Sequence, residues 1–328
     1  MGKRFIGIAE ETTYGTAESA TDWIDVVSES ITSEQGFIEV ETAGRRERVE
    51  RVPGPYNVGG SFDMIVNADN ITKLLKWCLG DVSTTDDGSS PTPLAYRHEF
   101  TPSQTLKSFT MEICPDVASQ SRQVVGCMVS SIAFEATARE LLTASVDVIG
   151  QKDSLISPST PTFSTVRPFI FFEGSVSDGG SPISDVEAFR VTIENDIPDD
   201  AYVLGDRFRP DLTKRVQGMT VSGDMDISFL DWDYFKKFYG SASATEPQTS
   251  ITPLALKLTF TGESTASSQT GFDKFLLEID LPKVYLDTSE ANFDRRDRIV
   301  QSLGFTAVYD PTADYICKVT VVNENSTP

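Results

Sequence analysis

Two segments of this chain share one pattern of residues, which indicates that the chain is internally duplicated. The first runs from Val58 to Gly80 (VGGSFDMIV…ITKLLKWCLG), and the second runs from Val221 to Gly240 (VSGDMDISFLDWDYFKKFYG). After an early glycine, apolar and polar residues alternate in each segment, which predicts a strand with one buried face. A short lysine-bearing segment with helical spacing then leads to a closing glycine. We therefore expect a strand followed by a short helix in each half of the chain.

The two helices should lie near residues 69–79 and 231–239. Asp69 or Asn70 can cap the start of the first helix, and Asp231 can cap the second. Gly80 and Gly240 occupy the position after each helix, where a left-handed backbone conformation is common and glycine is preferred.

The match continues on both sides of these segments, in the same order. A charged loop precedes each strand, at residues 41–51 and 206–215. Downstream, LKSFTMEIC parallels FDKFLLEID, and each half then ends in a long apolar-polar alternation, LLTASVDVIG and IVQSLGFTAVYD. Four matched pairs favour duplication, although any β-rich chain with a short helix can be aligned with itself to some extent. The intervening residues, rich in proline, serine and threonine, indicate a linker, and the apolar run Pro168–Val176 that follows reads as a buried strand.

The composition restricts where the protein acts. No run approaches the roughly 18–20 apolar residues that span a bilayer, and the start of the chain lacks the apolar core and cleavage site of a signal peptide. We therefore expect folding in a cytoplasm and no membrane partner. The formal net charge of −21, from 49 acidic and 28 basic residues, opposes passive binding to nucleic acid. It suits either a saline environment or a structural need for an acidic surface.

Candidate catalytic and metal-binding residues are few. The only histidine, His98, reads as a cross-strand surface residue, and its replacement by alanine should change stability by less than about 0.5 kcal/mol. The four cysteines lack the close pairs of a zinc site. A Cys114–Cys127 disulfide is conceivable, but a cytoplasmic setting disfavours it. We expect no enzyme activity, no cofactor and no metal.

The residues as a whole resemble a known family. The opening Gly7–Thr32 (GIAEETTYGTAESATDWIDVVSESIT), then GFIEVE, a charged loop, the VGGSFDM strand and the ITKLLKWCLG helix, is similar to tail tube (major tail) proteins of long-tailed bacterial and archaeal viruses. The resemblance implies a mainly β fold with two tandem tail-tube-like β-sandwich or half-barrel domains, each with one short flanking α-helix. The expected divisions are an N-terminal arm (1–29), tube domain copy 1 (30–152), a linker (153–166), tube domain copy 2 (167–310) and a C-terminal tail (311–328).

The same resemblance implies a structural virion protein of the tail, assembled in the host cytoplasm. Its strands would join those of neighbours in a ring, and stacked rings would enclose a channel for the genome. Two domains per chain would give trimeric rings with pseudo-sixfold symmetry. Expected partners are further copies of the chain, the tape measure protein, and tail-terminator and baseplate proteins. An acidic lumen would let DNA pass without specific binding.

The basic residues of the two charged loops are candidates for contacts between stacked rings, because arginine and carboxylate groups form bidentate pairs. These candidates are Arg45, Arg46, Arg48, Arg51, Arg207, Arg209, Lys214 and Arg215. Each loop could equally be a solvated charged hairpin. Another non-enzymatic β-rich virion or surface protein, such as an adhesin or a carbohydrate-binding module, is the alternative function. Such a module would expose aromatic residues on loops, whereas many aromatics here lie on apolar stripes.

Overall fold

The computed structural model describes residues 4–116, 119–292 and 298–328, and it is mainly β. The first half contains β1 (Phe5–Glu10), β2 (Asp22–Ile24), β3 (Val26–Glu29), β4 (Thr32–Val40), β5 (Glu50–Ile65), α1 (Thr72–Leu79), β6 (Gly80–Asp86), β7 (Tyr96–Pro102), β8 (Phe109–Cys114), β9 (Ser121–Thr137), β10 (Thr143–Gly150) and β11 (Lys152–Ile156). The second half contains a 3₁₀ turn (Phe171–Glu173), β12 (Gly174–Asp178), β13 (Ser181–Pro182), β14 (Val186–Asn195), β15 (Met219–Ser228), α2 (Asp233–Tyr239), β16 (Leu254–Ser264), β17 (Lys274–Asn292), β18 (Val300–Ala307) and β19 (Lys318–Asn323).

Strand pairing follows one order in both halves. In the first half the antiparallel neighbours run β2-β1-β8-β9-β10-β5-β4, with β11 along the first part of β9. In the second half they run β13-β12-β16-β17-β18-β15-β14, with β19 along the first part of β17. Each strand of the second series thus occupies the place of one strand of the first. Within the described residues, the β6–β7 hairpin is present in the first half alone.

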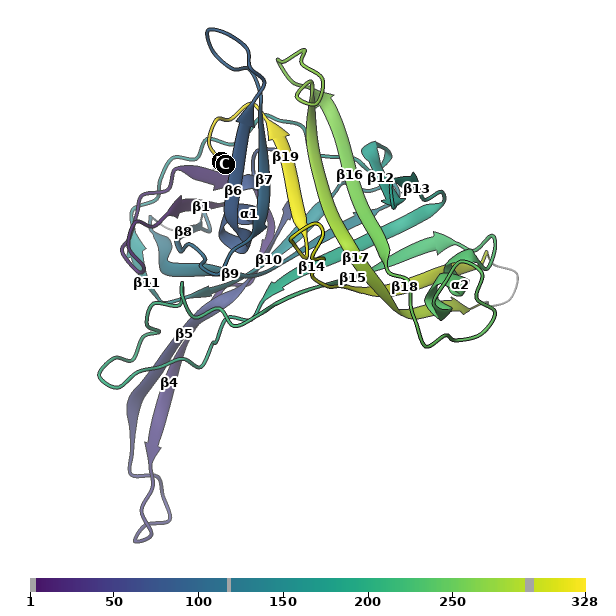
Figure 1. The fold of residues 1–328 in the computed structure, drawn as a ribbon. Coiled ribbons are helices and arrows are strands. Elements are labelled where there is room, and N and C mark those ends of the chain that lie inside the picture. The colour runs from purple at the N-terminus through teal and green to yellow at the C-terminus, as the bar shows by residue number, and fades with distance from the viewer. Residues whose placement is uncertain (1–3, 117–118, 293–297) are drawn as a thin grey trace.

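The two halves share one curved sheet, because β14 pairs with the second part of β9 (Figure 1). Cross-strand register places one buried residue from each of seven strands in a row: Phe62, Val146, Ile132, Ile193, Val221, Ala307 and Val284. These side chains belong to one hydrophobic core that extends through both halves. The period of two along each strand leaves the other face of the sheet to polar residues.

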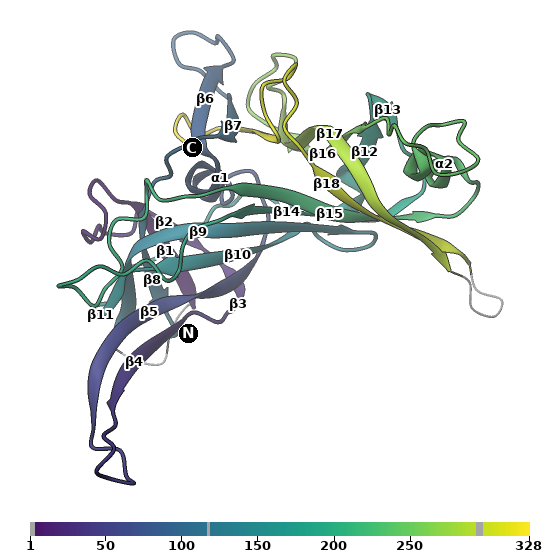
Figure 2. The same cartoon turned by 60° about the horizontal axis from the view of Figure 1, so that its bottom comes forward.

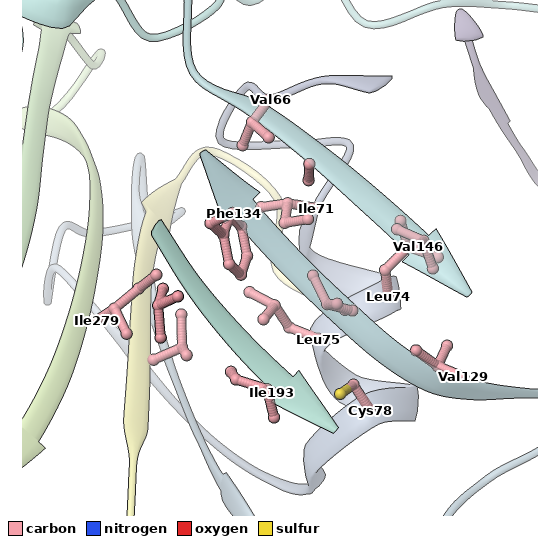
Figure 3. Close-up of a cluster of buried hydrophobic side chains, with 14 of the residues drawn as sticks. Val66, Ile71, Leu74, Leu75, Cys78, Val129, Phe134, Val146, Ile193 and Ile279 are labelled. Atoms are coloured by element: carbon pink, nitrogen blue, oxygen red, sulfur yellow. The ribbon is translucent and has the colours of Figure 1, made fainter. Parts of the chain in front are cut away.

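The two helices lie where the sequence predicts them, but their environments differ. Six of the eight residues of α1 are buried, and α1 packs in the core between the halves (Figure 3). None of the residues of α2 is fully buried. The backbone turns at Gly80 (φ +92°) and Gly240 (φ +131°), both positive angles that glycine adopts without strain. Neither helix has a side-chain cap, because the N-cap residues are Ile71 and Trp232, so the predicted caps at Asp69 or Asn70 and at Asp231 are wrong. Asp231 does accept a hydrogen bond from the Asp233 amide at the start of α2.

Three segments differ from their expected structure. Pro168–Val176 is not a buried strand, because Phe171 and Phe172 lie in the 3₁₀ turn and are exposed. Residues 4–29, expected as an arm, supply β1–β3, and β1 is almost entirely buried. The expected tail contains β19, a buried strand that joins β17 of its own half to β7 of the other. Both chain ends therefore contribute to the core.

Candidate assembly surfaces and polar sheet face

The polar face of the curved sheet is the first candidate surface. Along it the acids Glu135, Asp147 and Glu194 are exposed, and the remaining positions are mostly serine, threonine and aspartate. Arg190 lies on β14 and its guanidinium contacts Glu135 at 2.9 Å and Asp224 at 2.6 Å. The hydrogen bond to Glu135, followed in size by the hydrogen bond to Asp224, raises the pKa of Arg190. This arginine is thus neutralised by its neighbours, and the face keeps an excess of negative charge.

The two ends of the sheet are the second candidate surface. The second part of β9 has a strand on each side, β10 and β14. Its counterpart, residues 285–292 of β17, pairs with β18 on one side, and no other described strand pairs with it, since the pairing with β16 ends at Val284. At the opposite end, β3 and β4 pair with β5 and have no second neighbour among the described strands. Each unpaired edge presents backbone N–H and C=O groups that can pair with another chain.

The third surface is a long hairpin formed by β4 and β5, which projects well away from the body of the molecule (Figures 1 and 2). Its tip carries four of the predicted contact residues. Arg48 pairs with Glu39 and Glu41, and Arg51 pairs with Glu39. Arg45 and Arg46 are exposed and form no ion pair with the described part of the chain.

The loop between β14 and β15 (residues 196–218) has the same place in the second half, but it folds back onto the base of this hairpin. The Tyr56 amide donates to the Arg207 carbonyl at 3.1 Å, and the Tyr202 hydroxyl donates to the Tyr56 carbonyl at 3.1 Å. The ring of Phe208 meets that of Tyr56 edge to face. The loop thus fixes the direction in which the hairpin projects.

Arg209 is the centre of this contact. It is 5% exposed, and its guanidinium donates to the carbonyls of Asp199 (2.9 Å), Val58 (3.2 Å) and Gly150 (2.9 Å). A side chain held in this way is not available for a contact with another copy of the chain. Arg207 is half-buried, while Lys214 and Arg215 are exposed on the same loop.

His98 is fully buried, so the expectation of a surface residue is wrong. The histidine lies on β7, and β19 covers it from the other half of the chain. Its Nε2 donates to the Asn325 carbonyl at 3.0 Å, which leaves Nδ1 to accept from the Thr84 hydroxyl at 2.9 Å. Burial lowers the pKa of His98. The ring has a structural role between the halves, which the sequence could not reveal because β19 lies far from it along the chain.

The cysteines and the other candidate metal ligands of the described residues form no reactive or metal-binding site. All four cysteines are free and buried, including Cys114 and Cys127. Burial raises the pKa of Cys78 to about 12, which keeps that thiol protonated. In the described ranges, no group of histidine, cysteine, aspartate or glutamate side chains could hold a metal ion. None of the helices described has the length and apolar character needed to cross a membrane.

The chain thus combines a strand order that recurs in both halves, two sheet edges with no second described strand, and a projecting hairpin, features of a structural β protein. A family model described as phage tail tube protein matches residues 3–307 of the chain. The chain therefore belongs to the phage tail tube protein family. It is a component of the virion tail, assembled in the host cytoplasm. Among curated proteins, none matches the chain.

Proposed function

We propose that this protein assembles into closed rings that stack into the tail tube and act as a non-enzymatic conduit for the genome. The junction between β9 and β14 carries the proposal, because it is a sheet-to-sheet contact between two units with the same strand order. The unpaired edges of β17 and β3–β4 are the counterparts of these two strands. Pairing them between chains would repeat the internal junction at every boundary of a ring.

The number of chains follows from the duplication. We infer that each half is one copy of the tube domain, so that three chains supply six similar units. The ring would then have true threefold and approximate sixfold symmetry. Closed symmetry would satisfy both unpaired edges of each chain at once, which no open arrangement does.

In such a ring the polar sheet face would line the channel, because the opposite face is covered by the helices and the core. The exposed acids Glu135, Asp147 and Glu194 would then repel the phosphates of DNA, so that the genome passes without specific binding. The tape measure protein would occupy the channel before the genome does. Tail-terminator and baseplate proteins would meet the two ends of the tube.

Stacking would depend mainly on the β4–β5 hairpin. Because the counterpart loop of the second half (residues 196–218) folds back, each ring of three would extend three β4–β5 hairpins, not six, toward the next ring. Arg45 and Arg46 are the strongest candidates for contacts with acidic residues there, with Arg207, Lys214 and Arg215 nearer the ring body. Such exposed contacts would weaken as salt screens them.

The test is the size and shape of the assembled protein. We expect native mass spectrometry of the purified chain to give a species of three subunits, and electron microscopy of negatively stained samples to show rings or tubes with a central channel. Rings of six chains would contradict the inference of two tube domains per chain. A protein that stays monomeric at high concentration and in virion-like buffer would contradict the proposed assembly itself.

A further inference from the structure

The helix α2 carries an aromatic face that the described part of the chain leaves partly exposed. Phe229, Trp232, Phe235 and Tyr239 contact one another in sequence, with ring centroids 4.9–5.2 Å apart. Trp232 is 55% exposed and the adjacent Leu230 is 75% exposed. The inner side of the helix is different, because Tyr234 and Phe238 pack against the core. A soluble protein rarely leaves such a contiguous aromatic group in water without a partner.

The first half of the chain shows what covers this position. Counted back from Gly80 and Gly240, Leu75 of α1 corresponds to Phe235 of α2. Leu75 is completely buried in the cluster that contains Ile193 and Ile279, both from the second half (Figure 3). The faces of α1 and α2 are thus equivalent, but the second half of the chain covers α1 alone.

Hydrogen bonds show that β14 and β19 are the strands of the second half that cover α1. The Asn195 side chain, at the end of β14, donates to the Cys78 carbonyl of α1 at 2.9 Å. The Asn323 side chain, at the end of β19, donates to the Ala68 carbonyl just before α1 at 3.0 Å. The strand order makes β3–β4 the counterpart of β14 and β11 the counterpart of β19. Both counterparts expose apolar side chains, Val27 at 64% and Leu155 at 66%.

We propose that the aromatic face of α2 is a lateral docking site for a second copy of this chain, which covers it with its β3–β4 segment and β11. The inference rests on the proposed ring. It adds that ring closure needs a hydrophobic contact outside the sheet, in addition to strand pairing at the β17 edge. In the ring α2 would become as buried as α1, with Trp232 as the anchor of the contact.

Tryptophan fluorescence tests the contact directly, because the three tryptophans have different environments. Trp77 is fully buried and Trp23 is half-buried, so Trp232 is the exposed one. The difference between the spectra of the parent protein and Trp232→Phe isolates its emission. We expect this emission to shift to shorter wavelength when dilute subunits assemble into rings. An emission that is unchanged on assembly would overturn the docking site while leaving the proposed tube intact.

Substitution gives a second readout. Trp232→Ala should leave the isolated subunit folded with a modest loss of stability, because Trp232 is more than half exposed there and loses only its contacts with Phe229 and Phe235. It should raise the concentration needed for ring assembly at least roughly tenfold, as expected for an aromatic anchor. Phe172→Ala, which removes another exposed aromatic side chain outside the proposed contact, is the matched control and should assemble normally. Normal assembly of Trp232→Ala would refute the inference, whereas failure of the parent protein to form any ring would refute the proposed function as well.

Discussion

At the scale of single residues, Arg209 shows how one buried charge can join the two halves of a chain. It holds carbonyls from β5, from the end of β10 and from the loop that precedes it. Charge-assisted hydrogen bonds of this kind contribute more than neutral ones, and their loss leaves buried carbonyls without partners.

We predict that Arg209→Ala destabilises the subunit by roughly 1.5–3 kcal/mol, the range for hydrogen bonds to charged groups. Urea unfolding of the isolated subunit measures this change. Arg215→Ala, an exposed position on the same loop, should stay within about 0.5 kcal/mol of the parent. Equal stability of the two variants would show that the buried guanidinium is dispensable.

His98 gives a pH dependence with a definite sign. Its pKa is lowered from 6.5 by burial, so below pH 6.5 the unfolded chain binds a proton that the folded chain does not. The neutral histidine therefore makes its full contribution to the free energy of unfolding above pH 6.5, and this contribution is lost as the pH falls below 6.5. His98→Gln should abolish this slope below pH 6.5, and His98→Ala should lower the free energy of unfolding by about 1–3 kcal/mol. An unchanged slope in His98→Gln would contradict this assignment, since the chain has no other histidine.

Neither residue could be understood from the sequence alone. Arg209 lies in a charged loop with Asp206 and Asp211 around it, a pattern typical of solvent-exposed turns. His98 occupies a strand whose neighbours along the chain are polar. In both cases the other half of the chain supplies the burial, and that contact depends on pairings between residues more than a hundred positions apart.

At the scale of elements, local patterns predicted the helices well and the hairpin poorly. The helical spacing before Gly80 and Gly240 needs only neighbouring residues to be recognised. In contrast, the length of the hairpin could not be predicted, because β5 extends to Glu50 through Pro53, Gly54 and Pro55, residue types that usually interrupt a strand. The projecting part of β5, residues 50–57, precedes Val58 and pairs with β4 alone. Half of its N–H groups therefore point away from any strand, and proline is tolerated there.

The hairpin tip allows a sharper test of ring stacking than reversal of all its arginines. Arg48→Glu would place a carboxylate beside Glu39 and Glu41 and disturb the hairpin itself. We predict that Arg45→Glu with Arg46→Glu leaves folding and ring formation intact but shortens the tubes, and that high salt partly reproduces this effect in the parent protein. Tube length in electron micrographs measures the outcome.

The matched control is Lys214→Glu with Arg215→Glu, which makes the same change of charge on the second loop. Because that loop does not project as the hairpin does, its variant should form longer tubes than the tip variant. If both variants form full-length tubes, the arginines at the tip belong to a solvated hairpin and have no part in stacking.

At the scale of the whole molecule, the recurrence of strand and helix in the two halves could be predicted from the sequence, while the way the halves meet could not. Repeated strand and helix patterns need only a comparison of the chain with itself. The pairing of β9 with β14 joins two polar-apolar alternations that could each have paired with many other strands. What selects it is the common core beneath the sheet, where Ile132 and Ile193 lie opposite each other and are both completely buried.

The polar sheet face leads to the prediction with the most direct bearing on genome delivery. Asp147 and Glu194 are exposed on this face, so lysine can replace both without entering the core. We predict that Asp147→Lys with Glu194→Lys leaves tube formation intact and slows DNA release from the virion, because cationic side chains would bind phosphates along the channel. Release kinetics at increasing salt measure this, and higher salt should restore the rate.

Asp81→Lys with Asp86→Lys changes the charge equally at exposed positions on β6, away from this face, and should release DNA at the parent rate. Both variants have the same net charge, so the comparison distinguishes the effect of where the added charge lies from the effect of the net charge itself on DNA release. If the two variants release DNA equally slowly, the net charge of the tube governs passage. If both match the parent, the polar face does not line the channel, and the orientation of the sheet in the ring must be reversed.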